Sequence, residues 1–408
     1  MRSVRKSSFV AVGVVAAFSL VLAACSNSSS SSSTQASSSG GEVPQIAAGD
    51  FTADFAVMQQ LTGLAAQGDG LIGVLLPDTT TSTRYVQYDA PFLAKAFEAA
   101  GLTSDQYKID NAHGSAQTMQ TQADADINAG ASVLLIDPLD AGSGAAIEAK
   151  AESQGVAVID YDRLVSGGPE DRYYVSFNNV QVGELIGQGE VDCIDAWKVQ
   201  DPSLLIMNGD PTDNNAKLFA QGYHSVLDPL FSDKTYTKVG EPAGTWDPPT
   251  AATTFEQQFT AHPEINAVVA PNDDNANAII SILKKNQIAA NTFPIGGQDA
   301  SPVGLQNILL GYQCGTVYKP FHAEAQAAAA LALYLRAGVT PPSTLVNSTT
   351  KDDEIGKDIP SVYTVPVWVQ TDGVADVLAD SETTGVGPTA KDVCTGQVQS
   401  ACQAAGIS

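Results

Sequence analysis

The chain has 408 residues, 44% of them hydrophobic, and a formal net charge of −25 at pH 7. A single hydrophobic core stops growing near roughly 250–300 residues, so this length favours two globular domains. The strong negative charge repels polyanions and therefore argues against a nucleic-acid-binding protein.

The N-terminal segment has the pattern of a secretory signal. Basic residues at positions 2, 5 and 6 precede the apolar run SSFVAVGVVAAFSLVLAAC, which ends in small residues at Cys25. The sequence LAAC resembles a bacterial lipobox, in which the cysteine becomes the lipidated first residue. We expect residues 1–24 to be a signal peptide, Cys25 to be lipidated and the serine-rich residues 25–49 to form a flexible tether. A plain signal cleaved nearby, or an uncleaved anchor, is the alternative.

Beyond the tether, short apolar runs alternate with segments of helical periodicity. Helical patterns lie between several of the runs, as in residues 88–102, 142–155 and 275–287. This alternation predicts parallel sheets covered by helices on both faces, which is the α/β class. The expected strands are residues 71–76, 132–136, 156–161, 173–177, 203–207, 266–270, 293–297 and 314–318.

Polar groups follow nearly every expected strand, as in DPLD, GDPTDNN, PNDD and QDA. Ligands of open parallel sheets bind beyond the carboxyl ends of the strands. Capping and turn formation explain any one such loop. Several of the loops also carry Arg, Lys or adjacent amides, which capping does not require. Together they predict a polar binding cleft.

The composition of these loops suits a hydroxyl-rich neutral ligand. Asp accepts hydroxyl groups, Asn both accepts and donates, and Arg donates a fork of N–H groups. An aromatic ring, supplied by Tyr85 or Trp246, covers the C–H side of a pyranose. Carboxylates would repel a phosphate, and no glycine-rich phosphate loop is present. The sequence therefore favours a sugar, with polar groups at Asp162, Arg163, Asp213, Asn214, Asn272, Asp273 and Asp299.

Several segments resemble one known family. They are VIDYDR (158–163), YYVSFNN (173–179), GDPTDNNAKLF (209–219), VVAPNDDNANAI (268–279), GGQDA (296–300) and CGTVYKP (314–320). In order and spacing they are similar to the periplasmic sugar-binding proteins of ABC importers, in the ribose/galactose-type cluster and nearest its D-xylose-binding branch. The resemblance covers roughly residues 70 to 370.

The resemblance implies the periplasmic binding protein type I fold. This is an α/β fold of two similar lobes, each a parallel sheet flanked by helices, which are joined by a three-strand hinge and close around one sugar. The N-terminal lobe would comprise residues 70–178 and 319–358. The C-terminal lobe and tail would comprise residues 179–318 and 359–408, including SVYTVPVWV (361–369) as a single strand.

The resemblance also implies which residues contact the sugar. Lys217 lies four residues after Asp213, so on one helix both would face the cleft; a surface ion pair is the alternative. For Trp246 the alternative is a core position, and for Arg163 an internal pair with Asp162. The implied set is Arg84, Tyr85, Asp137, Asp162, Arg163, Asp213, Asn214, Lys217, Trp246, Asn272, Asp299 and Lys319.

Two loops depart from the D-xylose-binding pattern. TTTSTRY offers Arg84 and Tyr85 where relatives have two arginines and a tryptophan, and NDDNANA lacks the glycines that follow ND. Both departures lie at the cleft. The resemblance therefore implies a monosaccharide, xylose or a similar aldose, and leaves its identity open.

Four cysteines besides Cys25 form an even set, which permits disulfides in an oxidising compartment. Of three connectivities for Cys193, Cys314, Cys394 and Cys402, we favour the one pairing Cys394 with Cys402. On one continuous helix those two would be about 12 Å apart, so that pair requires a turn. The four histidines match no metal spacing, and we expect no metal and no cofactor.

The resulting hypothesis is an extracytoplasmic solute-binding lipoprotein. It would be a monomer that delivers a monosaccharide to the permease subunits of an ABC transporter, held to the outer face of the bacterial cell membrane by its lipid anchor only. We expect no enzymatic activity, because no carboxylate lies in a recognisable catalytic motif. A sugar sensor subunit for a membrane receptor and a secreted glycosidase are the alternatives. A repressor of this fold would need a helix-turn-helix where the signal lies.

Overall fold

The computed structural model describes residues 43–79 and 82–407 of the chain. The expected signal peptide, the lipidation site Cys25 and residues 26–42 of the expected tether lie outside the described residues. Within the described part, no helix combines the length and the apolar character that a membrane span requires.

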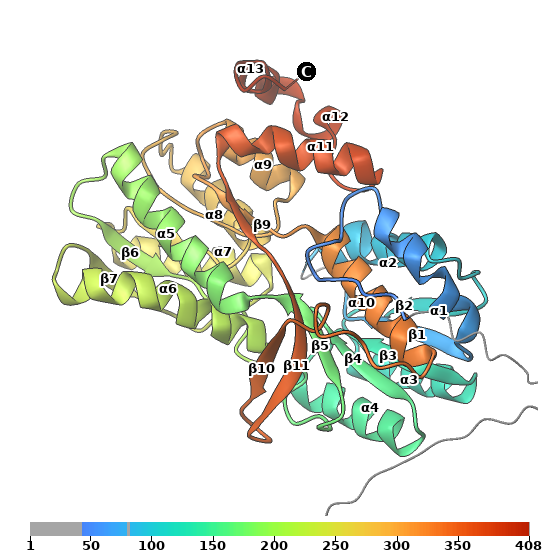
Figure 1. Ribbon diagram of the computed structural model, residues 1–408. Coiled ribbons are helices and arrows are strands. Elements are labelled where there is room, and N and C mark those ends of the chain that lie inside the picture. Colours follow the sequence, from blue (N-terminus) through green and yellow to red (C-terminus); the bar gives the residue numbers. More distant parts are fainter. Residues whose placement is uncertain (1–42, 80–81, 408) are drawn as a thin grey trace, which may run out of the picture. The chain divides into compact units, whose positions relative to one another are not determined.

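The first of two main sheets has seven strands in the order β10-β11-β5-β4-β3-β1-β2 (Figure 1). All neighbours in it are parallel except β10 and β11, which form an antiparallel hairpin. The strands are β1 (Leu71–Leu76), β2 (Tyr107–Asn111), β3 (Ala131–Ile136), β4 (Ala157–Tyr161), β5 (Tyr173–Phe177), β10 (Ser348–Asp352) and β11 (Lys357–Thr364).

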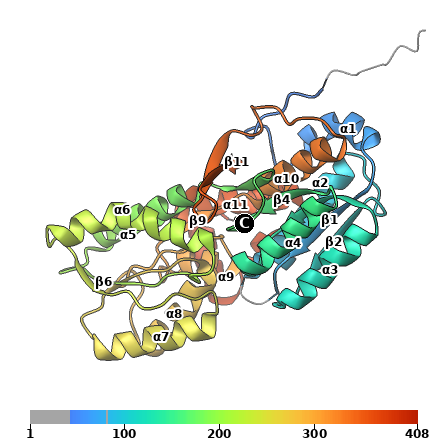
Figure 2. The ribbon, with the colours of Figure 1, turned by 90° about the horizontal axis from the view of Figure 1, so that it is seen from below.

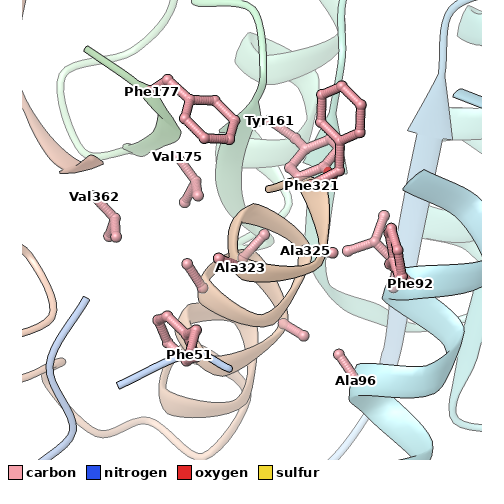
Figure 3. Close-up of a cluster of buried hydrophobic side chains, with 14 of the residues drawn as sticks. Phe51, Phe92, Ala96, Tyr161, Val175, Phe177, Phe321, Ala323, Ala325 and Val362 are labelled. Atoms are coloured by element: carbon pink, nitrogen blue, oxygen red, sulfur yellow. The ribbon is translucent and has the colours of Figure 1, made fainter. Parts of the chain in front are cut away.

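Helices cover both faces of this sheet. Helices α2 (Ala90–Ala99) and α10 (Phe321–Arg336) pack on one face, and α3 (Ala116–Asn128) and α4 (Ala141–Ser153) pack on the other (Figures 1 and 2). The 3₁₀ helix η1 (Ala56–Leu61) and α1 (Thr62–Gln67) contact α10. Figure 3 shows the core on this side, where Phe321, Ala323 and Ala325 of α10 lie among Tyr161, Val175 and Phe177 of the strands.

The second main sheet is smaller, with the strand order β7-β6-β8 and parallel pairing throughout. Its strands are β6 (Ser203–Ile206), β7 (Thr237–Gly240) and β8 (Ala267–Val269). Leu204 and Ile206 share a core with α5 and α6, whereas Leu205 packs on the side of α7 and α8. The helices are α5 (Asn179–Trp197), α6 (Asn214–Ser232), α7 (Pro248–Ala261), α8 (Asp273–Lys285) and α9 (Pro302–Leu309).

The chain passes three times between the two lobes: after β5, after β9 (Thr316–Tyr318), and between β11 and β12 (Val367–Val369). β12 pairs with β9 of the second lobe, while Ser361–Thr364 of β11 pair with β5 of the first. The single strand expected at 361–369 is therefore wrong. The break falls at Pro366, which has no N–H group to continue a strand ladder. The first-lobe segment consequently extends to Thr364, six residues beyond the expected boundary at 358.

The end of the expected tether and several of the expected strands also differ from the structure. Residues 44–48 are not part of a free tether, because Ile46 is buried and Tyr334 and Thr344 bond the backbone of Pro44 and Ile46. An apolar residue that reaches a core orders the chain around it. The run at 293–297 forms only an isolated bridge at Ile295. The strands β2, β7 and β10 were missed because their residues are largely polar and mostly not fully buried.

Both disulfides link segments of the second lobe and its tail. Cys193 of α5 is bonded to Cys314, and the predicted pair Cys394–Cys402 is confirmed. The required turn is present, because the chain leaves α12 (Ala390–Val393) at Cys394 and passes through η4 (Gly396–Val398) before α13 (Gln399–Ala404). The preceding tail elements are η3 (Thr371–Gly373) and α11 (Val374–Thr384).

Candidate functional site

A hollow of about 300 Å³ lies where the loops of the two lobes meet. Nine of the twelve residues expected at the cleft line it: Arg84, Tyr85, Asp162, Arg163, Asp213, Trp246, Asn272, Asp299 and Lys319. Most lie beyond the carboxyl ends of β1, β4, β6, β7 and β8, as expected for an open parallel sheet; Asp299 lies just before α9, and Lys319 lies just after β9. Four residues that were not predicted complete the lining, namely Ser82, Asn215, Phe219 and Gln298.

Asp162 has a left-handed backbone, with φ at 58°. Its carbonyl oxygen accepts hydrogen bonds from the hydroxyls of Tyr174 (2.8 Å) and Ser176 (2.9 Å) and from the Asn215 amide (2.9 Å). A non-glycine residue in this region is strained, and surrounding contacts must hold it there. Here they hold the carboxylate towards the hollow.

The Asp162 carboxylate is stabilised as an anion. Arg84 Nη1 donates to Oδ1 over 2.8 Å, the Tyr85 hydroxyl donates to Oδ2 over 3.1 Å, and Lys319 Nζ lies 4.0 Å away. Burial alone would raise the pKa of Asp162, but Arg84, Lys319 and Arg163 outweigh it and lower the pKa. An ionised carboxylate of this kind is a strong acceptor for hydroxyl groups.

Asp299 also has a positive φ, at 94°, and the next residue, Ala300, has φ at 50°. Its backbone N–H donates to Val317 in β9 (2.9 Å), and its carboxylate lies 3.3 Å from Lys319 Nζ. Each lobe thus supplies the hollow with one carboxylate from a residue with a strained backbone, Asp162 in the first lobe and Asp299 in the second. Strain of this type clusters at ligand sites.

Arg163 and Asp213 connect the lobes. Arg163 Nε lies 3.2 Å from Asp213 Oδ2, which also accepts from Trp246 Nε1 over 3.0 Å. Asp213 is the N-cap of α6, and its other oxygen accepts the Asn215 N–H over 2.8 Å. Burial raises the pKa of Asp213 despite the opposing charge of Arg163. The alternative for Arg163, an internal pair with Asp162, is not the contact observed.

The adjacent residues Asn272 and Asp273, at the N-terminus of α8, point in different directions. Asn272 caps α8 by accepting the Asn275 N–H (3.0 Å) and lines the hollow. Asp273 faces away from it and bonds Ser301, Gln313 and other second-lobe groups. Burial raises the pKa of Asp273 to about 7. Asp273 therefore belongs to the lobe's internal structure.

Three predicted contacts do not line the hollow. Asp137 is fully buried behind Arg163, 3.7 Å from its Nε, and burial raises its pKa. Asn214 faces a neighbouring recess beside Asp140. Lys217 is exposed and borders a different hollow with Glu241 and Pro242.

The shared-face argument for Asp213 and Lys217 was wrong for a geometric reason. Asp213 is the cap of α6 and has extended backbone angles, φ −92° and ψ 126°, so helical spacing does not start there. The inward face of α6 begins with Asn215 and continues through Ala216 and Phe219. Asn215 is the first inward helical position and lines the hollow, and the adjacent Asn-Asn pair was its only signal in the sequence.

The charges around the hollow balance. Three cations, Arg84, Arg163 and Lys319, face three carboxylates, Asp162, Asp213 and Asp299. A ligand with its own charge would leave one of these groups without a buried partner, which is costly. The lining therefore suits a neutral ligand rich in hydroxyl groups. In residues 43–79 and 82–407, no group of His, Cys, Asp and Glu side chains is suited to a metal ion, and no histidine lines the hollow.

Comparisons with known proteins agree with this geometry. A family model described as a periplasmic binding protein domain matches residues 72–339. The chain is 32% identical over 321 residues to the D-xylose-binding periplasmic protein of Escherichia coli K12, with 78% of this chain and 92% of that protein covered. It is 30% identical over 331 residues to the multiple sugar-binding periplasmic protein SbpA of Azospirillum brasilense, with 78% and 90% covered.

A solved structure has the same fold. It is a carbohydrate transporter solute binding protein from Chloroflexus aurantiacus in complex with D-glucose, with a TM-score of 0.68 and 27% identity over 79% of this chain and 98% of that one. Together with the family match over residues 72–339, this likeness extends across both lobes. The chain belongs to the periplasmic binding protein family.

Proposed function

We propose that this protein binds a neutral monosaccharide, xylose or a similar aldose, and delivers it to the permease of an ABC transporter. The observation that carries the proposal is the lining of the hollow, in which three cations and three carboxylates lie together with Asn272 and Trp246. Such paired donors and acceptors match sugar hydroxyls. The named ligands of relatives, xylose and glucose, support the same class.

Thermal-shift screening with a panel of neutral aldoses tests the ligand class, because a ligand that binds only the folded state raises the melting temperature by mass action. Glucuronate and glucosamine are the matched charged controls. We expect at least one neutral aldose to stabilise the protein and both charged sugars to fail. Equal stabilisation by glucuronate would contradict the argument from charge balance.

We further propose that sugar binding closes two lobes, one of residues 43–178 and 319–364 and the other of residues 179–318 and 365–407. Two observations support this proposal. Both lobes contribute residues to one hollow, and the chain crosses between them three times, which permits a hinge motion. Small-angle scattering should show compaction on adding the sugar found by screening. Equal profiles with and without saturating sugar would refute closure.

The anchoring proposal rests on the N-terminal sequence. We propose that the protein is an extracytoplasmic, monomeric lipoprotein held to the outer face of the cell membrane through Cys25. Stable anchoring usually needs more than one acyl chain, which lipoproteins of this kind carry. Cys25→Ala should release the protein from membranes or leave it unprocessed. Normal processing and unchanged membrane retention of that variant would refute the anchor.

A further inference from the structure

A buried polar cluster lies directly behind the hollow, centred on Arg84. Its guanidinium stacks over the Phe321 ring at 4.0 Å. Four of its five N–H groups are engaged with carboxylates: Nη1 with Asp162 (2.8 Å), Nε and Nη2 with Asp89 (2.8 and 2.6 Å), and Nη2 also with Glu324 (2.7 Å). Arg84 therefore links Asp162, which lines the hollow, to two carboxylates that do not.

The local backbone brings Arg84 and Asp89 together. The chain from Tyr85 to Asp89 forms a π-helix, η2, in which hydrogen bonds join residues five apart. Arg84 immediately precedes η2 and Asp89 ends it, so the two lie five residues apart on one face. The Tyr161 hydroxyl donates to Asp89, which is fully buried. This fixes Asp89 beneath the guanidinium.

Glu324 reaches the same guanidinium from α10, which packs against η2 and α2 on one face of the first sheet. It lies in the first turn of α10, fully buried, on the helix whose neighbouring Ala323 and Ala325 pack in the core (Figure 3). Its Oε1 has no hydrogen-bond partner in the described part of the chain. Replacing a buried ion pair by hydrophobic residues is often neutral or stabilising. Folding stability alone is therefore a weak reason for a glutamate here.

We propose that Asp89 and Glu324 are positioning residues for ligand binding, which hold Arg84 so that it presents the Asp162 carboxylate to the hollow. The proposal rests on the proposed function, in which Asp162 accepts sugar hydroxyls. Neither Asp89 nor Glu324 lines the hollow, so neither touches the sugar. A preorganised acceptor binds more tightly because it need not be ordered on binding.

The charge of Glu324 gives this arrangement a pH dependence. Burial raises the pKa of Glu324 to about 8, and Arg84 opposes the rise. With Glu324 protonated, the cations Arg84 and Lys319 face the carboxylates of Asp89 and Asp162. Above that pH a third anion competes with Asp162 for Arg84, so sugar binding should weaken.

The groups that face Glu324 do not remove this effect. Burial raises the pKa of both Tyr161 and Tyr174 well above the ordinary value, so they stay neutral over the same range. The charged and titratable groups around Glu324 are Arg84, Asp89, Tyr161, Asp162, Tyr174 and Lys319.

The test is a calorimetric titration of the full-length protein with the aldose found by screening, from pH 6 to about pH 9.5. We expect affinity of the parent to fall about tenfold above pH 8, since one unit of coupled pKa shift corresponds to a tenfold change. Glu324→Gln mimics the protonated side chain, so it should bind within about twofold of the parent at pH 7 and keep that affinity at high pH. Asp89→Asn should weaken binding about tenfold at pH 7, because Arg84 loses a charged partner. Glu324→Leu should also weaken it at pH 7, because Arg84 Nη2 loses the oxygen that accepts its hydrogen bond.

Glu190→Gln is the matched control. Glu190 is fully buried in α5, burial raises its pKa to about 8, and it does not line the hollow. The sugar affinity of that variant should fall above pH 8, as it does in the parent. A flat parent profile, an unchanged profile in Glu324→Gln, or a loss that Glu190→Gln also removes overturns the positioning role. Failure of the parent to bind any aldose overturns the proposed function, and the positioning role with it.

Discussion

Arg163 and Asp213 form an ion pair, 3.2 Å between Nε and Oδ2, that joins the loop after β4 in one lobe to the cap of α6 in the other. The Asn215 amide makes a second connection, to the Asp162 carbonyl. Both contacts lie at the hollow. Groups that line the hollow therefore also connect the lobes, so the proposed sugar binding and lobe closure would depend on the same side chains.

Asp213→Asn tests this coupling. The amide retains the shape of the cap but loses the charge that pairs with Arg163. A hydrogen bond to a charged group contributes about 1.5–3 kcal/mol, so sugar affinity should fall roughly tenfold to a hundredfold. Isothermal titration calorimetry measures the change. Lys217→Ala is the control on the same helix, because Lys217 is exposed and borders a different hollow. Binding by Asp213→Asn within a factor of two of the parent would contradict the role of the pair.

Asp299 lines the hollow and has a backbone conformation that favours glycine. Asp299→Ala should weaken sugar binding by about one to two decades for loss of the charged acceptor. Asp299→Gly should bind equally poorly but unfold at a higher temperature than the alanine variant, because glycine adopts φ near 94° without strain. Calorimetry and thermal unfolding of both variants separate the two effects. Equal melting temperatures would show that the backbone at this position is not strained.

Trp246 lies against Gly209, and a Cβ at Gly209 would overlap the six-membered part of the indole. Gly209→Ala should therefore displace the ring, which lines the hollow and donates to Asp213. We expect about a tenfold loss of sugar affinity, within the range of a lost hydrogen bond and ring contact. Tryptophan fluorescence should shift in the same variant. Gly63→Ala, where an added Cβ meets nothing within 4 Å, is the control. Unchanged affinity with a displaced indole would show that the ring does not contact the sugar.

The sequence predicts the outline of this site well because its signals are local. Polar residues at the ends of apolar strands mark the loops, and parallel strands bring such loops together. The residues that the sequence does not reveal are those brought to the site by contacts between distant parts of the chain. Glu324 lies 240 residues from Arg84 in sequence, within an apolar helix, so no local pattern connects the two.

Two other misses have local physical causes. Lys217 was misplaced because helical spacing was counted from a residue that caps the helix and is not part of it. Asp137 follows a strand as the residues that line the hollow do, and only its depth behind Arg163 distinguishes it. The identity of a residue alone shows neither whether it caps a helix nor how deeply it is buried behind its neighbours.

The two disulfides should differ in their effect on stability. Cys193–Cys314 closes a loop of 121 residues, whereas Cys394–Cys402 closes one of eight. In the chain-entropy account, a disulfide stabilises the folded protein by lowering the entropy of the unfolded chain. A disulfide that closes a loop of about a hundred residues then contributes about 4.7 kcal/mol, and one that closes a loop of about fifteen contributes about 3 kcal/mol. The Cys193→Ala, Cys314→Ala double variant should therefore lose more stability in urea unfolding than the Cys394→Ala, Cys402→Ala double variant. The reverse order would show that native packing around the disulfides, and not loop length, determines their contribution.

Glu190 offers a stability prediction whose sign follows from its burial. Glu190 is fully buried, and burial raises its pKa from 4.5 to about 8, although the nearby Gly296 backbone N–H opposes the rise. The folded protein thus holds a proton that the unfolded chain has released between these pH values. The stability that this group contributes is complete below about pH 4.5, falls as pH rises and is lost above about pH 8, a change on the order of a few kcal/mol.

Glu190→Gln removes that titration. We expect the variant to resemble the parent in unfolding free energy near pH 5 and to exceed it by a few kcal/mol near pH 9. Urea unfolding at both pH values measures the difference. Glu184→Gln is the control, because Glu184 is exposed on the same helix, α5, and it should not alter the pH dependence. The unfolding free energies of the parent and Glu190→Gln could instead differ by the same amount at pH 5 and pH 9. In that case Glu190 does not titrate between these two pH values, and a buried partner or water must hold it ionised throughout.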